Sequence, residues 1–268
     1  QMNVTTGVLG RTIADYATNN LNIREFAILT PLSDYGRLLS ESFKEEVERA
    51  GMKIVAEEFF DEGANDFRKQ FLSLRQKLFA LKQARDSLVA VQDGGEYHRR
   101  RRADSLCLAD SALEIGGLFI PAECEDVLMI APQVHFFKIR TQMLGATGWH
   151  TTKTILDGKR YVQNAVFATS AETQRGDSLW VAFRNAYKRR YNDEPDRVSA
   201  LGYDAAALVC SMLVRLGADV GPTDLAEALR SVQGFQGASG RVSFDPRRGV
   251  NREAVVMKIL DKRFIRVR

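Results

Sequence analysis

The sequence has few of the residues that commonly carry enzymatic or metal chemistry. Its 268 residues include only 3 histidines and 3 cysteines, and their spacings fit no zinc motif. Three cysteines (Cys107, Cys124 and Cys210) are also too few for a disulfide scaffold. The sequence contains no P-loop, no G-x-S-x-G elbow and no H-E-x-x-H motif. We therefore expect no catalytic residue, no metal and no cofactor, and a protein that is not an enzyme.

Long hydrophobic runs are also missing. No stretch approaches the roughly 18 uncharged apolar residues of a membrane helix, so we expect a chain that does not span a membrane. Apolar residues make up 45% and charged residues 27% of the sequence, which excludes disordered and fibrous chains. The chain opens with Gln1, Met2 and Asn3, without a signal segment. It is therefore expected to be either cytosolic or a mature or truncated form.

The sequence carries only a small excess of positive charge. Lysine and arginine total 38 against 34 acidic residues, a formal charge of +4, and part of it lies in the run Arg99–Arg102. Nucleic-acid-binding proteins usually spread basic residues over a face or a helix, so we expect no nucleic-acid partner. We favour a solvated loop for the run, with docking of an acidic partner, phosphate or nucleic acid as the alternative.

The pattern of apolar residues predicts an α/β fold. Short apolar runs alternate with helical periodicities, in the order typical of a parallel sheet covered by helices on both faces. Strands are expected around Phe26, Ile54, Phe119, Met143 and Val166. Helices are expected over 9–21, from Ser33 or Asp34 to Gly51, from Asn65 or Asp66 through Leu81, and over 123–137. The pattern is weak from Ala84 to Glu114, and we expect a surface excursion, poorly ordered within 84–111.

The last third of the sequence has a different character. Three helices are predicted in succession, over 179–191, 199–216 and 223–232, followed by a closing hairpin of strands at 254–260 and 264–267. The helices carry apolar faces, for example Leu179 with Phe183 and Leu208 with Leu216, that need a sheet to cover them. We expect them either to pack against a partner copy or to leave an apolar patch exposed.

Parallel strands deliver the loops at their carboxyl ends to one edge of the sheet, where ligands of open α/β folds bind. At this edge the sequence places an aromatic ring, hydroxyl groups and a carboxylate, as small-molecule clefts do. The residues singled out for ligand binding are Ser33, Tyr35, Glu123, Thr147 and Trp149. The alternative is structural, because Glu123 stands where the caps and first-turn acids of helices belong.

One stretch resembles a known family. Residues 23–74, with "TPLSDYG" after a strand, "ERAG" closing a helix and "NDF" opening the next, resemble the second lobe of type I periplasmic solute-binding proteins of the leucine/isoleucine/valine-binding kind. "LFIPAECEDVLMIAPQV", "MLGATGW", "YVQNAVFATSA", "LGYDAAALV" and "FQGASGRVSFD" follow in the family's order. The "FIP" and "IAPQ" pieces resemble a branch of penicillin-binding-protein activators.

The resemblance implies one complete lobe and part of another. Residues 1–165 and 240–268 are similar to the second lobe, and 166–239 to the helical return segment of a first lobe whose N-terminal part is missing, which suggests a fragment or truncation. It implies that Tyr35 stacks on or bonds the ligand and that Glu123 meets a cationic group. Thr147, which stands where the family has an acid, and Trp149 would line the wall.

The resemblance also implies a function. We expect extracytoplasmic binding of a small polar, amino-acid-like ligand by a non-catalytic transport or sensing receptor, located in the periplasm or lipid-anchored at the cell envelope. The alternative is an envelope interaction protein that regulates a peptidoglycan synthase. The partners expected are the ligand, a transporter permease or peptidoglycan synthase, and, as a further option, a second copy in a homodimer.

Overall fold

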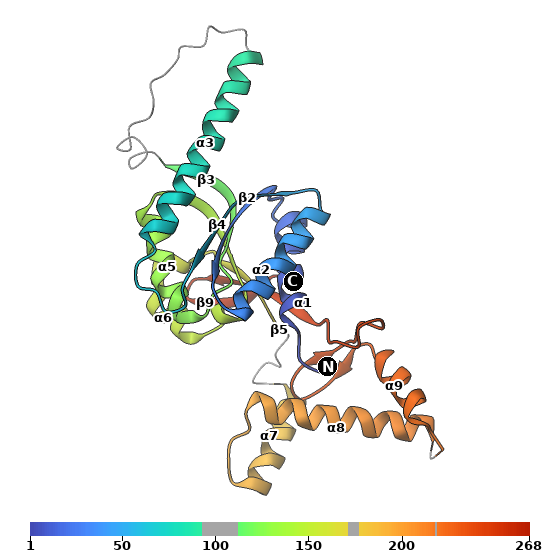
Figure 1. Ribbon diagram of the computed structural model, residues 1–268. Coiled ribbons are helices and arrows are strands. Elements are labelled where there is room, and N and C mark those ends of the chain that lie inside the picture. The colour runs from blue at the N-terminus through green and yellow to red at the C-terminus, as the bar shows by residue number, and fades with distance from the viewer. Residues whose placement is uncertain (93–111, 171–176, 218) are drawn as a thin grey trace. The chain divides into compact units, whose positions relative to one another are not determined.

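A computed structural model describes residues 1–92, 112–170, 177–217 and 219–268. The chain forms two compact units (Figure 1), and both are built from separate stretches of sequence. Residues 9–169 and 256–268 form one, here called the α/β unit. Residues 1–8 and 170–255 form the other, here called the helical unit.

A seven-stranded sheet with the order β2-β1-β3-β4-β5-β8-β9 forms the centre of the α/β unit. β1 pairs in parallel with β2 and β3, and β4 pairs in parallel with β3 and β5. β8 and β9 form an antiparallel hairpin. The strands are β1 (Glu25–Pro31), β2 (Lys53–Phe60), β3 (Leu113–Phe119), β4 (Ile139–Gly145), β5 (Val166–Ser170), β8 (Ala254–Leu260) and β9 (Arg263–Arg266). The expected parallel sheet and its closing hairpin are confirmed.

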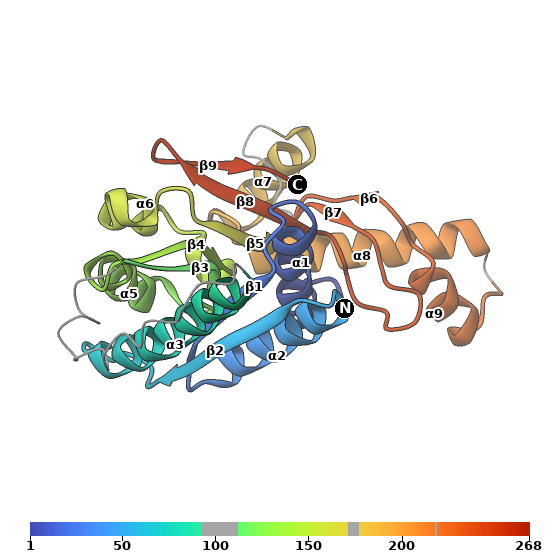
Figure 2. The same ribbon diagram turned by 90° about the horizontal axis from the view of Figure 1, so that it is seen from above.

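Helices cover both faces of this sheet, as Figure 2 shows. The helices are α1 (Thr6–Asn19), α2 (Asp34–Arg49), α3 (Arg68–Gln92), α5 (Cys124–Phe136) and α6 (Thr152–Gly158), with the short turns η1 (Thr147–Trp149) and η2 (Lys159–Val162). Phe43 of α2 stacks on Phe119, with ring centroids 4.2 Å apart. On the other face Phe71 of α3 and Ile130 of α5 join the main apolar core. Burial on both sides explains why every residue of β1 after Glu25 is buried.

The helix α3 is longer than the sequence predicts. It continues through Ala84 to Gln92, where we expected the surface excursion to begin, so the prediction is wrong for residues 84–92. This part of the chain contains residue types that favour a helix, among them Leu81, Lys82 and Arg85. The side chain of Arg85 also forms an ion pair with Glu25 of β1. Residues 93–111 of the expected excursion, with the arginine run, lie outside the described residues, and its last two residues, Leu113 and Glu114, belong to β3.

The helical unit has small cores. It contains α7 (Ser178–Tyr191), α8 (Arg197–Leu216), α9 (Pro222–Arg230) and the two-stranded ribbon of β6 (Phe235–Gln236) and β7 (Arg241–Val242). One core cluster centres on Phe183 and another on Leu208. The buried carboxylate of Asp204 accepts the backbone N–H groups of Ala238 (2.7 Å) and Ser239 (2.6 Å), and so fixes the 237–240 turn against α8.

The borders of the units differ from those predicted for the two lobes. Residues 1–8 and 240–255 belong to the helical unit, because Val4 bridges to Asn251 and β7 pairs with β6. Sequence patterns gave no signal for these pairings, of which the bridge between Val4 and Asn251 joins residues far apart in the sequence. The assignment of the two units to two lobes of one family fold stays a prediction.

Apolar side chains lie exposed on the helical unit, as expected if no partner copy covers them. The exposed fractions are 72% for Val198 and 85% for Val214 on α8, and 63% for Tyr191 on α7. Phe183 and Leu208 are buried, whereas Leu179 and Leu216 are exposed. Within the described residues, α8 alone has the length and composition of a helix that could cross a membrane.

Candidate functional site

The five candidate residues all lie at the carboxyl edge of the parallel strands. Ser33 and Tyr35 follow β1, Glu123 follows β3, and Thr147 and Trp149 follow β4. The strands β1, β3 and β4 are consecutive in the sheet and parallel. The loops therefore meet at one edge of the α/β unit, as the sequence predicts.

Tyr35 lies at the centre of this group. Its hydroxyl is buried and makes no hydrogen bond of good geometry in the described part of the chain, although the backbone of Gly148 and the side chain of Thr147 lie close enough to lower its pKa. Burial and the negative charge of Glu123 raise the pKa of Tyr35 to about 12, while nearby polar groups of Gly148 and Thr147 counteract part of the rise. Tyr35, Glu123 and Thr147 are thus neighbours, and Tyr35 stays protonated and able to donate a hydrogen bond.

Glu123 occupies the N-cap position of α5 but makes no side-chain cap bond. Partial burial raises the pKa of its carboxyl, and the charges of Glu125, Asp126 and Glu62 add to the rise. Of these neighbours, Glu125 pairs with Lys153 at 3.1 Å. A nearby cation would relieve the repulsion among the other acids, so the arrangement favours a positively charged group at this edge.

Gly148 holds the turn η1 against the loop after β3. A Cβ atom built at Gly148 would lie 2.4 Å from the carbonyl oxygen of Ala122 and 2.8 Å from the Cα of Glu123. Contacts of this length are too close for any side chain, so only glycine permits this approach. The absence of a side chain at Gly148 brings Thr147 and Glu123 together.

The prediction that Trp149 lines the ligand wall is wrong for the described structure. Its side chain is fully buried in the core of the α/β unit, and its indole N–H donates to the carbonyl of Ile120 at 3.0 Å. Gly145 makes room for the ring, since a Cβ there would lie 2.3 Å from ring atoms. Trp149 therefore supports the loop from inside.

Ser33 has a structural role that the sequence also predicted as an alternative. It is the N-cap of α2, and its hydroxyl accepts the N–H of Gly36 at 3.1 Å. It also lines an open hollow of about 430 Å³ between the ends of β1 and β2, together with Leu32, Arg37 and Phe59. Tyr35, Glu123 and Thr147 do not line this hollow.

Three residues of this edge are not among the predicted ligand-binding residues: Gly148, Asp126 and, as a neighbour of Glu123, Glu62. Asp126 accepts the N–H of Gly63 at 3.2 Å, and so joins the start of α5 to the loop after β2. The available signal was the position of each acid directly after a strand or in the first turn of a helix. Among the described residues, no group of three metal-ligating side chains is arranged to hold an ion.

Comparisons with solved structures show the fold. A leucine-binding protein, LivK of Thermotoga maritima, is 20% identical with a TM-score of 0.61, and the match covers 100% of this chain and 66% of that one. A putative branched-chain amino acid ABC transporter protein of Rhodospirillum rubrum is 18% identical with a TM-score of 0.71 (98% and 66%). A solute-binding protein of Rhodopseudomonas palustris BisB5, in complex with 3,4-dihydroxybenzoic acid, is 17% identical with a TM-score of 0.56 (98% and 64%).

The chain thus spans 66% of the length of the first two of these proteins. A search among curated proteins found no match. A family profile described as periplasmic binding protein matches residues 125–263, just over half of the chain. Together with its α/β sheet and the shared fold, this match shows that the chain belongs to the periplasmic binding protein family of type I fold.

Proposed function

We propose that the protein is an extracytoplasmic receptor that binds a small polar ligand carrying a cationic group and does not transform it chemically. Membership of the periplasmic binding protein family supports solute binding and a location outside the cytoplasm. A transporter permease is the partner that such a receptor serves.

The observation that carries the proposal is the Tyr35 hydroxyl. It is buried and makes no hydrogen bond of good geometry in the described chain, with only weak contacts to Gly148 and Thr147, and a fully unsatisfied buried hydroxyl costs up to about 1–3 kcal/mol. It lies at the ligand-binding edge expected for an α/β fold and beside the carboxylate of Glu123. A ligand that accepts a hydrogen bond from Tyr35 would remove this cost.

The acids around Glu123 narrow the ligand class. The relatives' names include leucine and 3,4-dihydroxybenzoic acid, so ligands of this fold range from zwitterions to aromatic acids. A ligand whose only charge is a carboxylate would be repelled by Glu123, Asp126 and Glu62. An ammonium or guanidinium group would be attracted.

Calorimetric titration with a panel of neutral amino acids, basic amino acids and benzoates tests the ligand class. We expect heat only from ligands with a cationic group.

Tyr35→Phe should weaken their binding about 2- to 12-fold, the value of one hydrogen bond of roughly 0.5–1.5 kcal/mol. Tyr161→Phe is the matched control, because the Tyr161 hydroxyl is already paired with Arg160 at 3.0 Å. Equal affinities of both variants and the wild type would refute the role of Tyr35.

A second candidate function is an envelope interaction protein that regulates a peptidoglycan synthase. The exposed apolar side chains of α7 and α8, with Val214 at 85% exposure, favour it, because such surfaces mark protein interfaces. Surface plasmon resonance with a purified synthase distinguishes the two functions. The second function would be favoured if the synthase binds the wild type but not Val214→Glu, and if no compound of the ligand panel gives heat of binding in the calorimeter.

A further inference from the structure

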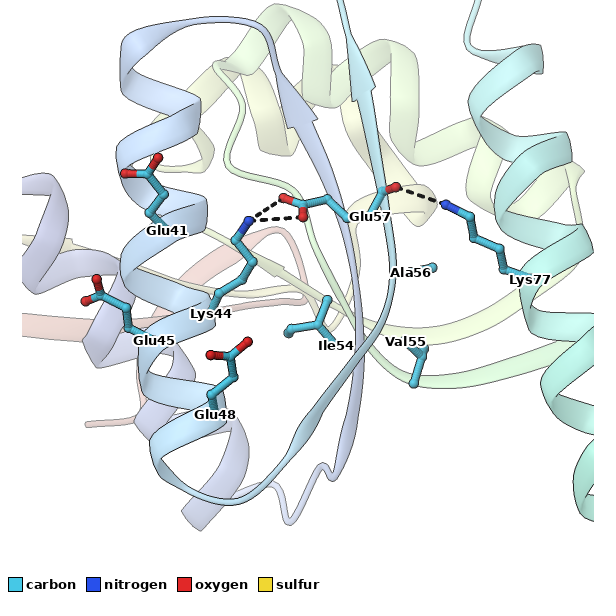
Figure 3. A pocket seen from close by; sticks show the side chains of 9 residues that line it. All are labelled: Glu41, Lys44, Glu45, Glu48, Ile54, Val55, Ala56, Glu57 and Lys77. Carbon is cyan, nitrogen blue, oxygen red and sulfur yellow. Dashed lines mark hydrogen bonds and ion pairs between the residues drawn. The ribbon is translucent and has the colours of Figure 1, made fainter.

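The edge strand β2 forms the floor of an open groove that the proposed function does not use. The groove has a volume of about 680 Å³ and is lined by α2, β2 and Lys77 of α3 (Figure 3). Its floor includes the half-buried Ile54 and Val55. At this end of the sheet no described strand pairs with the outer side of β2.

One wall of the groove is acidic. Glu41, Glu45 and Glu48 are exposed along one side of α2, and no cation of the described chain pairs with them. Lys44 and Lys77 also line the groove, but they pair with Glu57 and Glu58 of β2. Spacings of four and three residues place like charges next to each other on a helix, which costs stability. The acids also approach the carboxyl end of α2, where the helix dipole disfavours negative charge. A cationic partner would relieve both costs.

The opposite edge of the same sheet is basic. β9 and its turn carry Lys262, Arg263 and Arg266, all exposed, and no carboxylate of the described chain pairs with them. Ile265 is 41% exposed in the same strand. Figure 2 shows β2 and β9 at opposite ends of the sheet.

The two edges complement each other in charge and in dimensions. From Glu41 to Glu48 a helix rises about 10 Å, and β9 extends about 10 Å from Arg263 to Arg266, with Arg263 and Ile265 on one face of the strand and Arg266 on the other. Apolar Ile265 would meet the apolar floor of the groove. We propose that the α/β unit associates head to tail with further copies of itself, the basic edge β9 of one copy lying in the acidic groove along β2 of the next.

Side chains, rather than a continuous ladder of backbone hydrogen bonds, would hold this contact. Lys77 donates to the carbonyl of Glu57 at 3.2 Å, and Gln70 donates to that of Phe59 at 2.9 Å, so these outward carbonyls of β2 are occupied. A register shift opposite Phe26 and Ala27 further interrupts the edge. The association should therefore be electrostatic and sensitive to salt. Because the interface is heterologous, each copy keeps one free edge after pairing, so copies add on to form open chains or rings.

Sedimentation velocity of the full chain at rising concentration tests the proposal. We expect oligomers near 20 mM salt and an apparent dissociation constant at least about tenfold weaker near 500 mM salt, where screening is short-ranged. Association through the exposed apolar helices would instead persist or strengthen with salt. Such persistence, or a monomer at every concentration in low salt, would overturn the proposal.

Charge reversal identifies the two surfaces. The triple variant E41K/E45K/E48K and the double variant R263E/R266E should each stay monomeric, because their two edges carry like charge. An equimolar mixture of the two, or one chain carrying all five changes, should associate again, because every contact is then complementary. A second triple variant, D86K/D157K/E227K, changes the net charge equally at exposed acids away from both edges and should associate like the wild type. Failure of the mixture to associate, with both variants folded by circular dichroism, would contradict the proposed contact.

Discussion

At the residue scale, Glu123 has a proposed role in ligand binding and a destabilising effect on the folded chain. Its carboxyl has a raised pKa in the folded chain, so the unfolded chain ionises it at lower pH than the folded chain does. Ionised Glu123 therefore costs stability as the pH rises above the ordinary glutamate range, and this cost is absent in acid. A bound cation would offset it.

We therefore expect Glu123→Gln to raise the free energy of unfolding at neutral pH and to leave it nearly unchanged near roughly pH 4, close to the ordinary glutamate pKa. The same variant should lose affinity for cationic ligands. Urea denaturation at both pH values and calorimetric titration measure the two effects. Lower stability of the variant at neutral pH would show that the carboxylate makes a favourable contact in the fold.

Trp149 lies in the core and not at the ligand wall, because its side chain points into the α/β unit. Because it fills the core and bonds the Ile120 carbonyl, Trp149→Ala should cost about 3–5 kcal/mol of unfolding free energy. Phe136→Ala is the control, since Phe136 is 75% exposed and should change stability by no more than about 0.5 kcal/mol. Chemical denaturation compares them, and similar values would place Trp149 outside the core.

At the scale of elements, the turn η1 depends on the glycine at its centre. Gly148→Ala would push a methyl group into the Ala122 carbonyl, and we expect a loss of about 1–3 kcal/mol as the turn moves away from Glu123. Gly202→Ala in α8 meets no atom within 4 Å and should stabilise that helix by roughly 0.5–1 kcal/mol. Thermal unfolding of the two variants checks both the sign and the size of the difference.

The elements that could be predicted correctly from the sequence are those with a strong apolar periodicity or a strong boundary signal. The strand at Phe26 ends where Pro31 indicates, and α2 begins at the cap that Ser33 provides. The apolar periodicity of α3 is interrupted by Arg85 and Asp86 and becomes weak toward its far end, so residue propensity, a weaker signal, was all that could predict the helix there. The position of Trp149 could not be predicted, because an aromatic residue after a strand suits a wall or a core equally. Only the space above Gly145 decides between them.

At the scale of the whole molecule, the two units differ in how much they bury. All but one residue of β1 is buried, whereas α9 buries none and α7 buries only Phe183. Local opening is easiest where few apolar contacts hold a helix. The units should therefore differ in their resistance to opening.

Hydrogen exchange followed by mass spectrometry measures this difference. Amides of α7 and α9 should exchange at least about 100-fold faster than those of β1, β3 and β4, a difference of roughly 3 kcal/mol in opening free energy. Peptides from α5 serve as an internal reference, because this helix buries Val127 and Ile130. Uniform protection across both units would mean that another surface covers the helices in solution.

The place of β8 in the sheet has a consequence for the synthesis of the chain. β8 lies next to β5, yet nearly all of the helical unit lies between them in sequence. A ribosome that adds about 5–20 residues per second therefore exposes β5 for several seconds before β8 exists. During this time the outer edge of β5 is open to strands of other nascent chains. We therefore expect a chaperone to cover the edge of β5 until residues 254–260 have been made and β8 can pair there.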